Sequence, residues 1–346
     1  MKNEYLSWMA ANTPTQYCND DALMPDIEAA LESGAVGCTS NPPLSYEALT
    51  TTPELMAEDV AKIEKGLDPD ENALQHMMCV VKMISKKLMP LYEKTNGQYG
   101  YVRAQVQPKA SDNVEAMLDQ GKRLAAIAKN VMIKIPGTKA GLVVLEELAA
   151  LGIPTNPTVC TTVPQMIAVA EAYERGAARA KAAGLKPAKS TAAMVMGRLQ
   201  DYLTGLNEER KLGLTKEELD WAALACCKRA CKIYDEKGYN SMVMPAAFRA
   251  PMQVEQLVGC KCEMTIHPKV QKQVAEADAA GTIKREAGYD KPINMEAVEK
   301  VMKLIPEYAG AYEPDGLTVD QFDTYGAVML TLDGFDKTGW QKLRTL

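Results

Sequence analysis

The sequence predicts an α/β fold: a (β/α)₈ barrel with a helical insertion and a C-terminal helical extension. Short β-like runs alternate with longer helical runs, and eight such pairs can be counted along the chain. Repeated βα units indicate a parallel sheet, and eight of them favour a closed barrel. The alternative is an open doubly wound sheet. However, no GxGxxG follows the first strand, and Gly137-Thr138-Lys139 lacks the upstream glycine of a Walker A motif.

The eight expected strands are short and rich in apolar residues. They cover residues 16–19, 36–40, 101–106, 130–136, 153–155, 190–195, 241–244 and 262–266. Helices are expected between them, over 26–33, 111–128, 140–151, 163–183, 196–206 and 216–237. Gly34 would end the first of these helices, and Ser111 would be the N-cap of the second.

We expect one barrel domain over residues 1–346, with the barrel at about 15–282 and the extension at about 283–346. Residues 292–312 and 318–346 read as helices without further strands. The extension would pack on the barrel or on a partner subunit. The sequence does not decide between a monomer and a homo-oligomer. For the helix-rich insertion over about 46–94, packing is the simplest role.

Composition excludes several classes of function. The 346 residues are 47 % hydrophobic and carry a net charge of −6, which attracts neither nucleic acid nor an anionic membrane. We see no signal peptide and no apolar run of transmembrane length. The nine cysteines are odd in number and scattered, without the paired spacing of a zinc site. We therefore expect reduced buried thiols, a cytoplasmic protein, and no metal or cofactor.

Lys134 is the most informative residue. It lies between Ile133 and Ile135 in a β-branched strand that ends at Pro136. A lysine at a strand end can simply reach solvent with its amine. Alternatively, burial disfavours its ammonium form, and a neutral amine in a dry pocket can form a Schiff base with a ketone.

Polar residues cluster at the carboxyl ends of the expected strands, where the active site of such a barrel lies. They supply a carboxylate, an amine, hydroxyl and amide groups, and two guanidinium groups suited to one phosphate. A strand-end Asn or Thr is often only a helix N-cap, so their shared position is what favours a site. The candidates are Asp20, Ser40, Asn41, Gln105, Lys134, Asn156, Thr158, Arg198 and Arg249.

At these positions the sequence resembles the transaldolase family, in family order from about Asp20 to His267. The segments that carry the resemblance are Gly37-Cys38-Thr39-Ser40-Asn41-Pro42, Val131 to Leu142 around Lys134, Gly152 to Thr158, Met196-Gly197-Arg198-Leu199-Gln200-Asp201, and Ala247-Phe248-Arg249.

The resemblance implies a cofactor-free Schiff-base enzyme with sugar phosphates as its partners. Lys134 would form the Schiff base, and Asp20, with Asn19 and Asp21 beside it, would be the acid/base. Asn41 and Asn156 would bind substrate hydroxyls, and Ser40 belongs to the same motif as Asn41. Thr158 would position the catalytic water. Arg198 and Arg249 would bind the terminal phosphate.

Four positions depart from the family pattern. The family's catalytic glutamate is replaced by Gln105, which cannot transfer a proton at neutral pH. The related fructose-6-phosphate aldolases carry Gln there too, together with a tyrosine where this chain has Val195. Two family serines are replaced by Ala193 and Ala247.

The function expected from the resemblance is transfer of a dihydroxyacetone unit from a ketose phosphate to an aldose phosphate, in carbohydrate metabolism and the pentose phosphate pathway. One alternative is an aldolase that releases dihydroxyacetone. Another is a sugar-phosphate binder that has lost catalysis.

Overall fold

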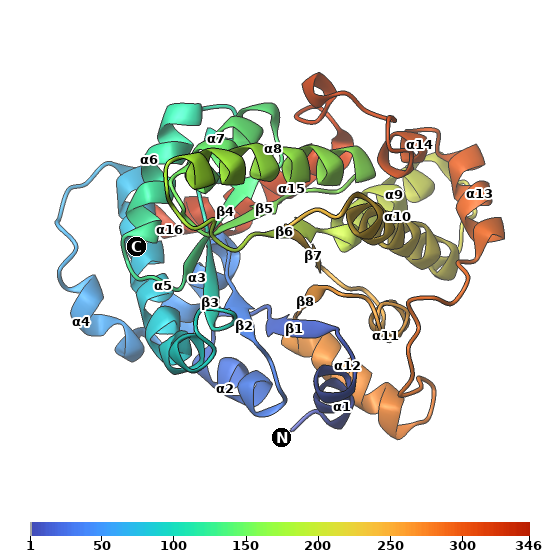
Figure 1. The fold of residues 1–346 in the computed structure, drawn as a ribbon, viewed down its shortest axis with the longest axis horizontal. Coiled ribbons are helices and arrows are strands. Elements are labelled where there is room, and N and C mark those ends of the chain that lie inside the picture. The colour runs from blue at the N-terminus through green and yellow to red at the C-terminus, as the bar shows by residue number, and fades with distance from the viewer. Residues whose placement is uncertain (1) are drawn as a thin grey trace.

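The computed structural model describes residues 2–346, and eight parallel strands lie at its centre (Figure 1). Six strands pair in the order β5-β4-β3-β2-β1-β8, and β6 pairs with β7. Bridges between Thr155 and Ser190 and between Cys160 and Met194 connect β5 to β6, while β7 packs beside β8. The predicted barrel is therefore confirmed. The strands are β1 (Gln16–Asn19), β2 (Gly37–Thr39), β3 (Tyr101–Gln105), β4 (Val131–Pro136), β5 (Thr155–Thr158), β6 (Thr191–Met194), β7 (Met242–Pro245) and β8 (Glu263–Ile266).

Helices surround the strands (Figure 1). Those before and within the barrel repeat are α1 (Glu4–Asn12), α2 (Met24–Glu32), α3 (Pro42–Thr51), α4 (Ala57–Val60), α5 (Pro69–Lys94), α6 (Val114–Ala125), α7 (Lys139–Ala150), α8 (Val163–Ala182), α9 (Met196–Arg210), α10 (Lys216–Lys237), α11 (Pro251–Glu255) and α12 (Pro268–Ala279). The extension adds α13 (Met295–Leu304), α14 (Glu307–Tyr312), α15 (Gly326–Phe335), the π-helical turn η4 (Asp336–Trp340) and α16 (Gln341–Leu343).

Several expected boundaries differ from the structure, and two of these differences have a clear local cause. Ser111 does not cap a helix, because a 3₁₀ turn η2 (Pro108–Ala110) ends there, and Asn113 caps α6 by accepting a hydrogen bond from the Ala116 N–H at 3.0 Å. The fifth strand covers Thr155–Thr158 rather than 153–155. It includes Pro157, a residue that sequence reasoning places outside strands.

Helix caps fix the loops at the carboxyl ends of the strands. Asn41 caps α3 by accepting from the Leu44 N–H at 3.0 Å, and Thr138 caps α7 by accepting from the Gly141 N–H at 3.1 Å. Gly141 itself must lack a side chain, because an added Cβ would lie 1.8 Å from the Pro136 carbonyl oxygen. These helices therefore begin directly at the strand ends.

The insertion and the extension both pack on the barrel. Helix α5 of the insertion buries Leu74, Met77 and Ile84 and contacts β3. The extension runs from α13 beside α10 to α16 beside α5, on opposite sides of the barrel (Figure 1). Near its end, Trp340 is fully buried and donates to Asp70 Oδ1 at 2.8 Å.

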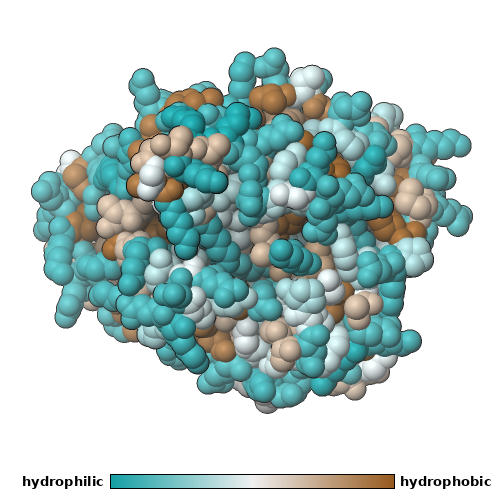
Figure 2. All heavy atoms as spheres, viewed as in Figure 1, coloured by the Kyte–Doolittle hydropathy of each residue, from teal (hydrophilic) through white to brown (hydrophobic). Residues whose placement is uncertain are grey.

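The surface is mostly polar. Figure 2 shows hydrophilic residues over most of the visible face, with apolar residues in small groups. Among residues 2–346, no helix combines the length and the apolar character needed to cross a bilayer.

Candidate active site

Two adjoining cavities lie at the carboxyl ends of the strands. The inner one has a volume of about 60 Å³, and the outer cleft has a volume of about 450 Å³. They share the lining residues Asp20, Asn41, Arg198, Ala247 and Phe335. Six of the predicted site residues line the inner cavity, namely Asp20, Asn41, Lys134, Asn156, Thr158 and Arg198.

Lys134 projects from β4 into the inner cavity and is only 6 % exposed. Its Nζ donates to the Ser40 carbonyl at 3.0 Å. Burial lowers the pKa of Lys134 to about 8; Asp20 opposes this shift, and Arg103 adds to it. The pKa is low enough for a substantial neutral fraction near physiological pH, which a nucleophilic amine needs.

Asp20 follows β1 and is the one carboxylate in the inner cavity among the described residues. Thr39 donates its hydroxyl to Asp20 Oδ1 at 2.5 Å, and the hydroxyls of Thr39 and Thr265 lie 2.6 Å apart. The neighbours are committed elsewhere: Asp21 accepts from the Leu23 N–H at 2.7 Å, and Asn19 accepts from Gln271 at 2.8 Å. The geometry therefore favours Asp20 over the adjacent residues.

Amide and hydroxyl groups line the rest of the inner cavity. Asn156 is fully buried on β5, and its amide nitrogen donates to the carbonyl and hydroxyl of Thr191. Its Oδ1 is buried with no partner among the described residues, as is suitable for a substrate hydroxyl. Thr158 lines the cavity two residues further along the same strand.

Two arginines meet at the outer cleft. Arg249 donates to Asp201 through Nε at 2.9 Å and Nη2 at 2.6 Å, and Arg198 Nη1 lies 3.7 Å from the same carboxylate. Burial lowers the pKa of Arg198, and the charge of Arg249 lowers it further. Two guanidinium groups against one carboxylate leave a net positive charge for an anion.

Phe335 closes this end of the site from the C-terminal extension. Its ring centroid lies 5.5 Å from Arg198 Cζ, and it lines both cavities. Gly339 lies against the backbone of Pro42 and Pro43, where an added Cβ would lie within 2.4 Å. The extension therefore packs on the loop that carries Asn41.

Gln105 and Ser40 do not line either cavity. Gln105 is paired in register with Lys134, and its Oε1 is buried without a partner in the described part of the chain. The Ser40 hydroxyl donates to the Arg103 carbonyl at 2.8 Å. Ser40 thus contacts Lys134 through its backbone carbonyl and not through its side chain.

One wall of the inner cavity is apolar. Ala193, Val195, Met244 and Ala247 form it, and all of them except Met244 are positions where the sequence departs from the family pattern. No side chain on this wall can donate to a substrate hydroxyl, so polar recognition there depends on Asn156, Thr158 and Thr265 on other strands.

Strained backbone borders the site on two sides. Val159, directly after β5, has φ +58°, and Ala247, after β7, has φ +60°. The left-handed region is unfavourable for a β-branched residue and occurs most often at functional positions. Gly197, in the first turn of α9, lets that helix approach the loop after β7, because a Cβ there would lie 1.7 Å from the Ala247 carbonyl oxygen.

Sequence reasoning did not assign roles to three residues of the cavity. Thr39 lies inside the motif around Asn41, and Thr265 is a polar residue near the carboxyl end of β8, so both had a local signal. Phe335 had none. It is distant in sequence, and only the fold of the extension brings it to the barrel.

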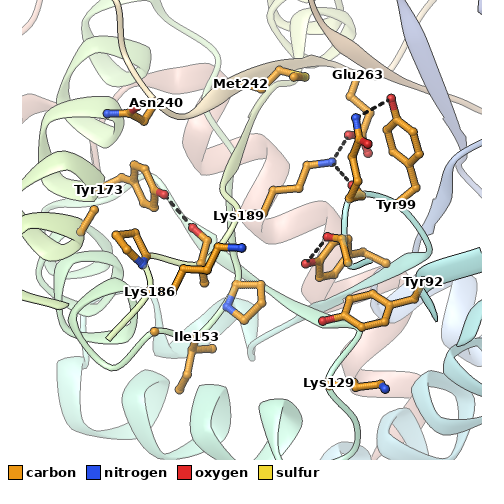
Figure 3. Close-up of a pocket in the computed structure, with 18 of the residues that line it drawn as sticks. Tyr92, Tyr99, Lys129, Ile153, Tyr173, Lys186, Lys189, Asn240, Met242 and Glu263 are labelled. Atoms are coloured by element: carbon orange, nitrogen blue, oxygen red, sulfur yellow. Dashed lines mark hydrogen bonds and ion pairs between the residues drawn. The ribbon is translucent and has the colours of Figure 1, made fainter. Parts of the chain in front are cut away.

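A larger cleft lies at the opposite mouth of the barrel, and Figure 3 shows residues that line it. It has a volume of about 1240 Å³ and is lined by residues near the amino ends of the strands, among them Tyr99, Lys189 and Glu263. None of the predicted site residues lies there. Size alone therefore does not locate the chemistry, since active sites of parallel barrels lie at the carboxyl ends.

The fold and site define an α/β barrel whose carboxyl-end mouth is built around a buried lysine. The family model described as Transaldolase/Fructose-6-phosphate aldolase matches residues 17–318. The chain belongs to this family.

Curated relatives agree. The chain is 31 % identical over 214 residues to a protein named transaldolase from Thiobacillus denitrificans, covering 59 % of this chain and 58 % of the relative. It is 32 % identical over 206 residues to transaldolase 1 from Streptomyces avermitilis, covering 58 % and 54 %. A transaldolase from Helicobacter pylori is 35 % identical over 142 residues, covering 40 % and 44 %. The chain thus spans about half the length of these curated relatives.

Proposed function

We propose that the protein transfers a dihydroxyacetone unit from a ketose phosphate to an aldose phosphate through a Schiff base on Lys134. The observation that carries this proposal is the buried Lys134 amine, with its pKa lowered to about 8, in a cavity with Asp20 and next to two arginines. The family of the chain and the names of its relatives support it.

The first half of the reaction cleaves the donor. The neutral Lys134 amine attacks the ketose carbonyl, water leaves, and a protonated imine forms. Asp20 takes the proton from the hydroxyl on the far carbon of the bond that breaks, which is the carbon that leaves as the aldehyde. The carbon–carbon electrons move to the imine, an aldehyde leaves, and a three-carbon enamine stays on Lys134.

The second half reverses these steps with the acceptor. The enamine carbon attacks the aldehyde of the aldose phosphate, Asp20 returns the proton to the new hydroxyl, and water hydrolyses the imine. Asn41 and Asn156 would hold the hydroxyls, Thr158 would position the water, and Arg198 and Arg249 would bind the phosphate.

A second candidate is cleavage that releases dihydroxyacetone. Gln105 favours it, because no carboxylate stands beside Lys134 in the register of β3 and β4. Product analysis with and without an aldose phosphate acceptor separates the two functions. Without the acceptor, the transferase should release at most one equivalent of aldehyde per enzyme and then stop. Continuous release would indicate the aldolase.

A binder without catalysis would need the arginines but not the lysine. Reduction with borohydride in the presence of fructose 6-phosphate tests this alternative, because only a Schiff base is trapped. Cytoplasmic location and a place in pentose phosphate metabolism follow from the proposed activity. All nine cysteines are free and buried, which agrees with a reducing compartment.

A further inference from the structure

A layer of three charged residues lies in the barrel interior beneath Lys134. Arg103 of β3 is fully buried and forms an ion pair with Glu263 of β8, which is 1 % exposed. Lys189 contacts the other carboxylate oxygen of Glu263 at 2.8 Å. Figure 3 shows Lys189 extending to Glu263 from the cleft at the amino ends of the strands, where its amine also faces Tyr99.

The layer is connected to Lys134 through the backbone. The Arg103 carbonyl accepts from the Ser40 N–H at 3.1 Å and from the Ser40 hydroxyl at 2.8 Å. The Ser40 carbonyl in turn accepts from Lys134 Nζ at 3.0 Å. The backbone of the arginine therefore sets the position of the group that holds the lysine amine.

Stability alone does not explain a buried charged layer. Replacing a buried ion pair by apolar residues is often neutral or stabilising, and the Arg103 Nε is left without a partner among the described residues. The fold also makes room for the guanidinium, because a Cβ on Gly37 would lie 2.7 Å from Arg103 Nη1. The layer carries two positive charges and one negative charge, so its net charge is positive.

We propose that Arg103, held by Glu263 and Lys189, is a positioning residue for Lys134: its backbone carbonyl fixes Ser40, which holds the amine, and its guanidinium places a buried positive charge in the layer beneath the amine. The inference rests on the proposed function. The other charged or titratable groups around Lys134 are Asp20 from β1, Cys38 from β2 and Arg198 from α9. Asp20 opposes Arg103, and the balance between them sets the charge of the amine.

The test measures the rate at which fructose 6-phosphate is trapped on Lys134 by cyanoborohydride, from about pH 6 to pH 10. Arg103→Met removes a positive charge, so the inflexion should move upward by about one pH unit, and trapping at pH 7 should slow about tenfold. Glu263→Gln removes the negative charge and should move the inflexion downward. A merely structural role would not produce opposite shifts.

Two further variants keep the test decisive if a buried charge variant fails to fold. Lys189→Met acts at the cleft, where the side chain is 21 % exposed, and should move the inflexion upward, less than Arg103→Met does. Cys18→Ala is the matched control. Its thiol contacts both Arg103 and Glu263, at 3.0 Å each, but carries no charge, so the inflexion should stay in place.

Inflexions that all stay in place, or that all move in one direction, would overturn the inference. If the wild-type protein forms no adduct on Lys134 at any pH, the proposed function has failed instead. The two failures are therefore distinguishable.

Discussion

Lys134 and Lys228 are both buried lysines with a pKa lowered to about 8 by burial, yet their surroundings differ. Lys228 donates to Gln256 Oε1, the Gly288 carbonyl and the Lys291 carbonyl at 3.0–3.1 Å. Among the described residues, Lys134 Nζ has one hydrogen-bond acceptor, the Ser40 carbonyl. A lysine with three acceptors stabilises the fold, whereas a lysine with one acceptor in a cavity is available for chemistry.

This contrast predicts a trade-off between stability and activity. One pKa unit is worth about 1.4 kcal/mol, so the drop from 10.5 to about 8 costs roughly 3 kcal/mol when Lys134 is protonated. This loss of folding stability is fully present below pH 8 and disappears as pH rises toward 10.5. Between these two pH values the unfolded chain still binds the proton that the folded chain has lost, so stability rises with pH. Lys134→Met should therefore raise the free energy of unfolding at pH 7 by about 1–3 kcal/mol while abolishing adduct formation.

Urea unfolding at pH 7 and pH 10 checks this prediction, and the gain should shrink at the higher pH. The matched control is Lys228→Met, which removes the donor from three acceptors, of which the Gly288 carbonyl is buried, and should destabilise by about 2–3 kcal/mol. Equal destabilisation by both variants would show that Lys134 is a structural lysine.

Gln105 gives a second prediction at the residue scale. Gln105→Glu would place a carboxylate in register with Lys134 and favour the protonated amine. The inflexion of adduct formation should rise by about one pH unit, and trapping at pH 7 should slow about tenfold. The control is Gln107→Glu, at a buried glutamine two residues further on that is not paired in register with Lys134. An unchanged inflexion in Gln105→Glu would place residue 105 away from the amine.

At the scale of elements, the C-terminal extension contributes Phe335 to the end of the candidate site that holds Arg198, where we propose that the phosphate binds. Phe335→Ala removes the ring that lies against Arg198. We expect the KM for a ketose phosphate to rise by roughly tenfold, because a cation–π contact with a partly buried arginine is worth about 1–2 kcal/mol. The KM for the unphosphorylated ketose should hardly change.

The control for this prediction is Leu330→Ala on the same helix, where the side chain is 61 % exposed. Steady-state kinetics with the two ketoses distinguishes recognition from folding. An equal loss for both substrates would mean that Phe335 supports the fold of the loop and does not assist phosphate binding.

Much at this scale could be predicted from the sequence, because local patterns carry it. The periodic apolar residues located the eight strands, and β1 and α10 have the predicted ends. The start of α6 was wrong because Asn113 competes with Ser111 as a cap, and β5 was shifted because Pro157 lies within a strand. The first error concerns which of two nearby residues makes the capping hydrogen bond. The second concerns a proline inside a strand, which sequence rules do not expect.

The site itself was predictable where strand order determines it. Asp20, Lys134, Asn156 and Thr158 follow or end strands whose carboxyl ends must converge in a barrel. The orientation of the Ser40 hydroxyl, the Arg103 layer and the arrival of Phe335 depend on contacts between distant segments. No pattern within one strand or helix encodes those contacts.

At the scale of the whole molecule, the proposed transferase must pass the fragment held on Lys134 to an acceptor. With an aldose phosphate present, we expect a new ketose phosphate to form at a rate at least tenfold above aldehyde release without the acceptor. Chromatographic product analysis over time checks this, with Asp20→Asn as the control that should form the Schiff base but not cleave the carbon–carbon bond. Equal rates with and without the acceptor would favour the aldolase.

The most direct test of the central claim is peptide mapping by mass spectrometry after borohydride reduction in the presence of fructose 6-phosphate. We expect a three-carbon adduct on the peptide that contains Lys134, and no adduct when Lys134 is replaced by Met. Turnover without an adduct on Lys134, or an adduct on another lysine such as Lys228, would contradict it.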